Sequence, residues 1–202
     1  MSLVPLATKK IRKFRLHARP SAVLRNLKVL LENAQDTPEL SKDIDAETKT
    51  ALGRLDTAAL FATVVRGQAP EWLAPHWTPA DGEPAPVALT VFAATIGDGL
   101  EAELAVALSR GETFRSRVLT ALGEELADQS AAFVERLVAE EAQVDACELS
   151  GRRPIQDAAH REALAFLDAG RVGIGVDVAG HRVPRFSRVG VVPWGPPSKK
   201  RK

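Results

Sequence analysis

The spacing of apolar residues changes along the first third of the chain, and each spacing predicts a different element. Positions 14–18 alternate apolar with charged residues, the two-residue period of a half-buried strand. After Pro20 the apolar residues recur every three or four positions, which predicts a helix with Ser21 as its N-cap. Its apolar face would hold Val23, Leu24, Leu27, Leu30 and Leu31.

Further along, apolar runs and turn residues predict the other elements. We expect strands over residues 60–65, 87–94, 172–178 and 189–192, and helices over residues 44–55, 99–110, 114–142 and 158–167. The runs Val87–Ala94 and Val172–Val178 are apolar on both faces, which predicts strands inside the sheet. Asp98 and Glu101 have the spacing of a capping box, and Ala179 with Gly180 predicts a turn. The inner face of the long helix is predicted to hold Val118, Leu122, Leu126, Ala132, Phe133 and Leu137.

A proline-rich stretch separates the two halves of the pattern. Residues 66–86 contain five prolines, which argue against a regular element there. The same stretch contains Trp72 and Trp77, so part of it is expected to pack against the core.

Length and composition fit one globular domain with short tails. The 202 residues divide into a flexible lead (1–9), a folded domain (10–195) and a disordered basic tail (196–202). No uncharged run approaches the ~20 residues of a membrane-spanning helix, and no secretory signal is visible. The only cysteine, Cys147, excludes an intrachain disulfide and is compatible with a cytoplasmic location.

Charge is segregated along the chain despite the net charge of +1. Residues 1–31 hold eight Lys or Arg and residues 182–202 hold seven, and neither segment contains an acid. All 26 acids therefore lie between them. This favours mutual neutralisation within one fold; a basic surface for a partner or for nucleic acid is the other interpretation. The sequence has few aromatic residues and no nucleic-acid-binding motif, so nucleic acid is the weaker candidate for such a partner.

Common catalytic motifs are missing from the sequence. The four histidines have no zinc-ligand spacing, and there is no P-loop. The glycines at 173, 175 and 180 imitate a dinucleotide fingerprint, but no helix follows them, so they are interpreted as strand and turn glycines. Cys147 has no histidine partner in sequence. The residues alone therefore predict neither a catalytic group nor a metal site.

Four segments in order nevertheless carry a resemblance to a known family. The four segments are residues 91–101 (VFAATIGDGLE), residues 119–123 (LTALG), the pair LD followed by RVGI within residues 167–174, and residues 184–190 (PRFSRVG). They are similar to segments of the reactivation domain of cobalamin-dependent methionine synthase. The resemblance spans about residues 10–195. The N-terminal helix-helix-strand arrangement, with Arg25-Asn26-Leu27, is similar to stand-alone versions of that domain.

The resemblance implies a fold, a role and partners. The fold would be a single curved α+β domain with a central antiparallel sheet flanked by helices. The role would be that of an accessory subunit in reductive reactivation, the remethylation of cobalamin by S-adenosylmethionine. Cobalamin would be carried by the partner, a cobalamin-dependent methionine synthase or another corrinoid protein, and a flavodoxin-like protein would donate the electron. The chain would thus be at most an accessory to a methyltransferase.

The ligand site implied by the resemblance is only half present. The family motif Arg-x-x-Pro-Gly-Tyr falls on residues 147–152, where only Gly151 is retained. An arginine at 152 or 153 is the candidate replacement for the missing carboxylate partner. The implied S-adenosylmethionine site comprises Gly151, Arg152, Arg153, Pro184, Ser187 and Gly190. Without a replacement arginine, weak or no binding is expected, and the alternative is a non-catalytic interaction module of the same fold.

Overall fold

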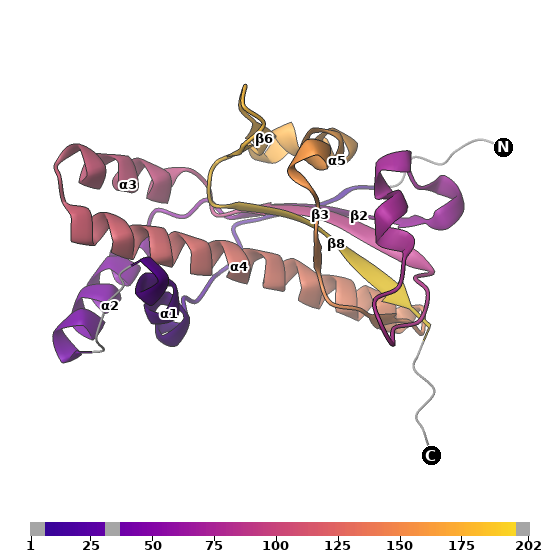
Figure 1. Ribbon diagram of the computed structural model, residues 1–202, viewed down its shortest axis with the longest axis horizontal. Helices are drawn as coiled ribbons and strands as arrows, with labels where there is room; N and C mark the ends of the chain where they lie inside the picture. The colour runs from indigo at the N-terminus through magenta and orange to yellow at the C-terminus, as the bar shows by residue number, and fades with distance from the viewer. Residues whose placement is uncertain (1–6, 31–36, 197–202) are drawn as a thin grey trace, which may run out of the picture.

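An antiparallel sheet forms the middle layer of the protein, as the computed structural model shows for residues 7–30 and 37–196 (Figure 1). Its strand order is β1-β2-β3-β8-β4, and β5 also pairs with β8. A separate hairpin joins β6 to β7. The strands are β1 (Lys9–Arg12), β2 (Ala58–Val65), β3 (Ala88–Thr95), β4 (Glu148–Leu149), β5 (Arg153–Pro154), β6 (Gly175–Val176), β7 (Arg182–Val183) and β8 (Ser187–Gly195).

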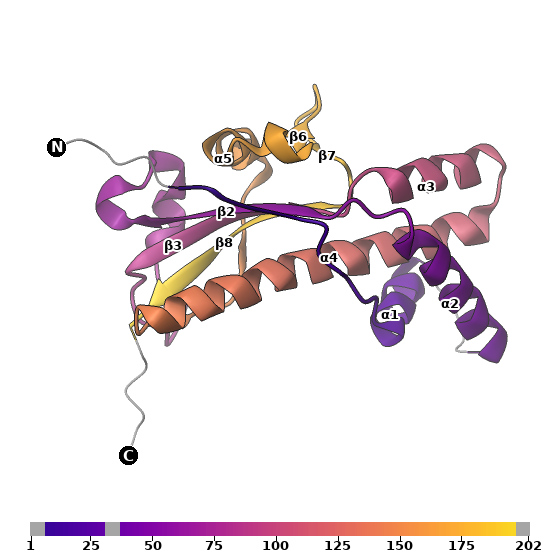
Figure 2. The ribbon, with the colours of Figure 1, turned by 180° about the vertical axis from the view of Figure 1, so that it is seen from behind.

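Helices cover both faces of this sheet. The long helix α4 runs along one face, and α5 with the β6–β7 hairpin lies on the other (Figures 1 and 2). The α-helices are α1 (Pro20–Leu30), α2 (Pro38–Leu52), α3 (Gly99–Ser109), α4 (Thr113–Val144) and α5 (His160–Leu167). Short 3₁₀ helices are η1 (Arg66–Gln68), η2 (Glu71–Trp77), η3 (Asp157–Ala159) and η4 (Ala169–Val172). No helix of the described part of the chain is long and apolar enough to cross a membrane.

Each central strand is buried on both sides because alternate residues enter two different cores. On β3, Leu89, Val91 and Ala93 pack toward α5 and η2, whereas Phe92 and Ala94 pack toward α4. All eight residues of β3 are buried. The apolar run that predicted this interior strand is therefore confirmed, as are the strands at β2 and β8.

Helix α4 is longer than the sheet it covers, so it takes part in two cores. Its 32 residues span about 48 Å at 1.5 Å per residue. The C-terminal half packs on the sheet through Ala131, Val134 and Val138. The N-terminal half extends beyond the sheet and forms a second core with α1, α2 and α3. The predicted inner face was correct in the N-terminal half, but Ala132, Phe133 and Leu137 are only half-buried.

The turn between β3 and α3 is fixed by close backbone packing. Gly97 has a φ of +81°, which favours glycine. At Gly99 an added Cβ would lie 2.4 Å from the Arg54 carbonyl oxygen. The Thr95 hydroxyl accepts a hydrogen bond from the Gly97 N–H at 3.1 Å. The glycines of this motif are therefore explained by the packing of the turn against the segment before β2.

The prediction of an interior strand over Val172–Val178 is wrong. Val172 ends η4, Gly173 has a φ of +73°, and only two residues of the segment pair, with β7. The Asp177 carboxylate accepts hydrogen bonds from the N–H groups of Ala179 and His181, so the chain turns back, and Val178 is fully exposed. The apolar residues Val172 and Ile174 pack onto the sheet from outside. The predicted turn at Ala179 and Gly180 is confirmed.

Two expectations for the N-terminal region also differ from the structure. Residues 14–18 are extended but unpaired, because Lys13, with a φ of +57°, turns the chain away after β1. The Phe14 ring instead stacks on Phe133 of α4 at 4.2 Å. Ser21 lies inside α1, which begins at Pro20, and is not its N-cap. Lys9, which the sequence placed in the flexible lead, belongs to β1. Residues 1–6 of the predicted lead and residues 197–202 of the predicted tail lie outside the described residues, and so does Leu31 of the predicted helix face.

Helix boundaries deviate where local capping was misinterpreted. Helix α2 begins at Pro38 rather than at residue 44, and the Thr37 hydroxyl accepts the Leu40 N–H at 3.2 Å. Thr-Pro is the ordinary N-cap and N1 pair, so this signal was present in the sequence. Asp98 makes no capping hydrogen bond, and the Glu101 carboxylate instead accepts the Arg185 N–H. The proposed capping box is therefore wrong.

The proline-rich stretch is more ordered than predicted. It forms η1 and η2, with Pro75 inside η2. Trp77 is buried, and Trp72 packs edge-on against Phe166 of α5 at 6.0 Å. The expectation that part of the stretch packs down is confirmed.

The close packing of the β3–α3 turn predicts a marked effect of one methyl group. We expect Gly99→Ala to lower the free energy of unfolding by about 1–3 kcal/mol, since backbone must move to admit the Cβ. Gly67→Ala is the matched control, because nothing lies within 4 Å of its added Cβ, and its effect should stay within about 0.5 kcal/mol. Urea denaturation measures both; equal stability of the two variants would contradict this explanation of the turn.

Candidate functional site

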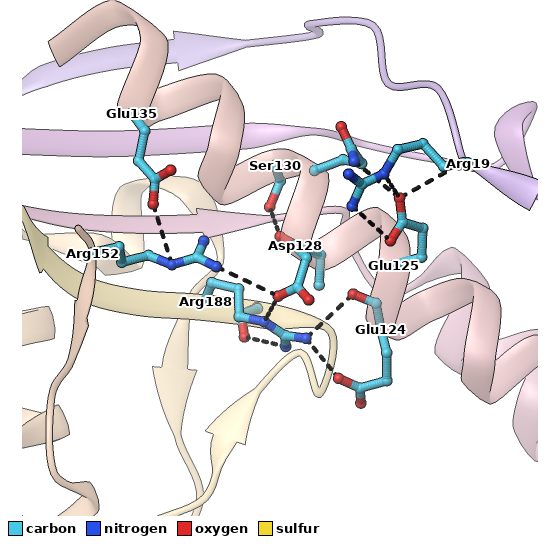
Figure 3. Close-up of polar contacts among 11 residues, drawn as sticks. Arg19, Glu124, Glu125, Asp128, Ser130, Glu135, Arg152 and Arg188 are labelled. Carbon is cyan, nitrogen blue, oxygen red and sulfur yellow. Dashed lines mark hydrogen bonds and ion pairs between the residues drawn. The ribbon is translucent and has the colours of Figure 1, made fainter. Parts of the chain in front are cut away.

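A row of acidic residues on α4 faces the edge of the sheet. Glu124, Asp128 and Glu135 are four and seven residues apart, which places them on one side of the helix (Figure 3). Arg188 of β8 binds two of them, with Nη2 2.6 Å from Glu124 Oε2 and Nε 2.8 Å from Asp128 Oδ1. Arg152 binds Glu135 at 3.2 Å and lies 3.9 Å from Asp128. Two arginines therefore share three carboxylates.

Arg188 is held firmly in its charged form by this arrangement. Burial lowers the pKa of its guanidinium, but hydrogen bonds to Asp128 and Glu124 outweigh that effect, and the pKa is raised overall. A further hydrogen bond runs to the Glu124 carbonyl at 3.3 Å. The Arg188 side chain thus links β8 to α4.

The next acid on the helix points to the opposite side and is buried. Glu125 is 1% exposed and accepts hydrogen bonds from Arg19 Nε at 2.7 Å and Nη2 at 3.3 Å. Gln129 Nε2 donates to the same carboxylate at 2.9 Å. The segment just before α1 is therefore fixed to α4 by a charged, bidentate contact (Figure 3). Together with Arg188, this confirms that basic residues near both ends of the chain are neutralised by acids of the middle.

The two arginines predicted to bind a ligand carboxylate diverge to opposite faces of the sheet. Arg152 reaches α4, as described above. Arg153 of β5 donates from Nη1 to the carbonyls of His76 and Thr78, and from Nη2 to Glu83 at 2.9 Å. Both guanidiniums are therefore occupied by acids of this chain.

The other predicted ligand residues lie along the same edge with different surroundings. Gly151 is exposed with open space around it, and Pro184 is buried between β7 and β8. The Ser187 hydroxyl is fully buried and donates to Thr95 Oγ1 at 3.0 Å. Gly190 pairs with Pro154, and an added Cβ there would lie 2.9 Å from the Phe92 ring. The structure thus brings these residues to β8 and its neighbours; their role in ligand binding stays a prediction.

A polar cavity that sequence reasoning missed lies beside Pro184. It has a volume of about 420 Å³, within the range of small-molecule sites. It lies where the β6–β7 hairpin meets the beginnings of α3 and α5. Its lining residues are Glu101, Asp157, His160, Asp177, His181, Arg182, Val183 and Arg185. The available signal was the group of charged and histidine residues at 177–185 between two apolar segments.

The buried histidine that lines this cavity is disfavoured in its charged form. His160 is 3% exposed, and burial, followed by the charge of Arg182, lowers its pKa below the ordinary value. Its Nδ1 lies 3.4 Å from Asp157 Oδ1. Within residues 7–30 and 37–196, no group of three or more His, Cys, Asp or Glu is placed to hold a metal ion. The lining of the cavity offers hydrogen-bonding and charged side chains.

Comparison with solved structures identifies a similar fold. The chain matches the MetH reactivation domain, determined as a crystal structure bound to AdoHcy, with a TM-score of 0.59 and 12% identity. The match covers 97% of this chain and 81% of that one. No family model and no curated protein matches the sequence. At this identity the likeness shows the fold, and it confirms the predicted α+β architecture with a central antiparallel sheet.

The Arg188 contacts predict a stability effect that can be separated from surface charge. We expect Arg188→Met to lower the free energy of unfolding by about 1–3 kcal/mol, because two carboxylates lose charged hydrogen bonds. Arg110→Met is the control, since its contact to Glu112 is 3.9 Å long and exposed, and it should change stability by less than about 0.5 kcal/mol. Thermal unfolding of both variants measures this difference. An Arg188→Met variant as stable as the wild-type chain would show that the Arg188 contacts add nothing to the free energy of unfolding.

Proposed function

We propose that this chain is an accessory protein of a cobalamin-dependent methionine synthase or another corrinoid protein, and that it presents an S-adenosyl ligand to the corrinoid. The observation that carries the proposal is the likeness to the MetH reactivation domain over nearly the whole chain, together with the AdoHcy bound in that structure. The similar segments in the sequence are separate support, because they are recognised from the residues and not from the fold.

The chain's own chemistry fits a presenting role rather than a corrinoid-carrying one. The sequence contains no Asp-x-His-x-x-Gly, the motif that supplies a histidine to cobalt in some corrinoid proteins. Bound S-adenosylmethionine would supply the methyl group, and an external flavodoxin-like donor would supply the electron. This chain would then bind and orient the ligand and contact the partner.

A second candidate is an interaction module of the same fold that no longer binds the ligand. The specific observation in its favour is that Arg152 and Arg153 are both occupied by acids of the chain. The buried Ser187 hydroxyl also favours the interaction module, because it already donates its hydrogen bond to Thr95. The two candidates therefore differ in a single measurable property, affinity for an S-adenosyl ligand.

Titration calorimetry with AdoHcy separates the two candidates. The presenting role predicts saturable binding with a Kd in the micromolar range, a binding free energy of about −8 kcal/mol. The interaction module predicts a Kd in the millimolar range or no heat of binding, about −4 kcal/mol or weaker. Adenosine is the control ligand, since equal affinity for adenosine would show that only the nucleoside is recognised. Absence of AdoHcy binding up to about 1 mM would rule out the presenting role.

A further inference from the structure

The cavity beside Pro184 is lined by an arginine whose guanidinium makes no ion pair with the described residues. Arg182 lies on β7 opposite Val176, and its side chain is half-buried. Its guanidinium forms no ion pair within 4 Å and no hydrogen bond with any residue among 7–30 and 37–196. In this it differs from Arg152, Arg153 and Arg188, which are all paired with carboxylates.

The surroundings of Arg182 disfavour the charged form of its guanidinium. Burial, followed by the positive charge of Arg188, lowers the pKa of Arg182 from its ordinary value. Asp157 and Glu124 act in the opposite sense but do not compensate for these effects. A carboxylate that entered the cavity would supply the missing counter-charge and would match the planar guanidinium with two parallel hydrogen bonds.

The rest of the lining indicates what else the ligand carries. Three acids, Glu101, Asp157 and Asp177, line the same cavity as Arg182 and Arg185. These carboxylates would repel a doubly charged phosphate, whereas they would attract an ammonium group next to the bound carboxylate. Burial and the charge of Arg182 lower the pKa of His160, which disfavours a positive charge there. The mixture of charges therefore fits a zwitterion better than a polyanion.

We propose that this cavity binds an α-amino acid group, with its carboxylate on the Arg182 guanidinium and its ammonium facing the acidic lining residues. Naming an S-adenosyl compound as the whole ligand rests on the proposed function; the amino acid subsite itself does not. Arg182 would then supply the carboxylate contact for which neither Arg152 nor Arg153 is free.

The test compares two ligands that differ by the amino acid group. AdoHcy and 5′-methylthioadenosine are titrated into the wild-type chain, Arg182→Gln and the control Arg110→Gln, whose arginine is exposed and remote from the cavity. We expect Arg182→Gln to weaken AdoHcy binding by about 10- to 100-fold, the loss of one charged hydrogen-bonded contact, and to leave methylthioadenosine unchanged. Arg110→Gln should leave both affinities unchanged. The Arg182 guanidinium makes no ion pair or hydrogen bond with the described residues that a Gln would break, so an unaltered melting temperature verifies that the variant folds.

A second probe keeps this proposal separate from the proposed function. L-methionine is added at millimolar concentration while NMR follows the arginine Nε–H resonances, with the Arg182 signal assigned by its absence in Arg182→Gln. A shift of that signal without AdoHcy binding would support the subsite and reject the presenting role. The subsite would be overturned, and the presenting role kept, if AdoHcy binds equally well to Arg182→Gln. The same conclusion would follow if AdoHcy binding is lost in Arg152→Gln but not in Arg182→Gln. Binding of neither probe would reject both.

Discussion

A buried carboxylate on the long helix constrains the arrangement of the whole chain. Glu125 is almost completely excluded from water, so its charge requires a partner, and Arg19 supplies one from the segment that leads into α1. One residue earlier on the same helix, Glu124 accepts from Arg188 of β8. Helix α4 thus fixes the N-terminal helices on one side and the sheet on the other, and its two halves belong to two cores. The position of every ligand-binding candidate on β8 depends on this attachment.

Sequence patterns predicted the elements whose burial is decided locally. The runs at β2, β3 and β8 are apolar on both faces and are interior strands, an environment that removes both faces from water. The same criterion failed at Val172–Val178, because Val172 and Ile174 are buried by packing onto a sheet rather than by pairing within it. Periodicity does not distinguish these two ways of burying valine. The hydrogen bonds that turn this segment back come from one side chain, Asp177, whose partners are not visible in a hydrophobic pattern.

The surroundings of the candidate site residues were predictable only in part, for a related reason. The resemblance located the edge formed by Gly151, Pro184 and Gly190, but it gave no information on which acids the nearby arginines contact. Arg152 and Arg153 are adjacent in sequence, yet one meets α4 and the other meets the proline-rich stretch. The cavity containing Arg182 is built from residues as distant in sequence as Glu101 and Arg185. Such a site exists only once the hairpin is folded against α3 and α5, so no local motif encodes it.

The central claim is that this chain acts on a corrinoid carried by another protein, and direct capture tests it. The purified chain, immobilised at low ionic strength, is exposed to the cobalamin-dependent methionine synthase of its own source in the cobalt(II) state. The claim predicts that a protein with the visible absorption spectrum of a corrinoid is retained in a stable stoichiometric ratio and is released as salt increases, as for a contact between charged surfaces. Retention of no corrinoid protein, with the chain folded and the cobalamin still bound to the synthase, would contradict it.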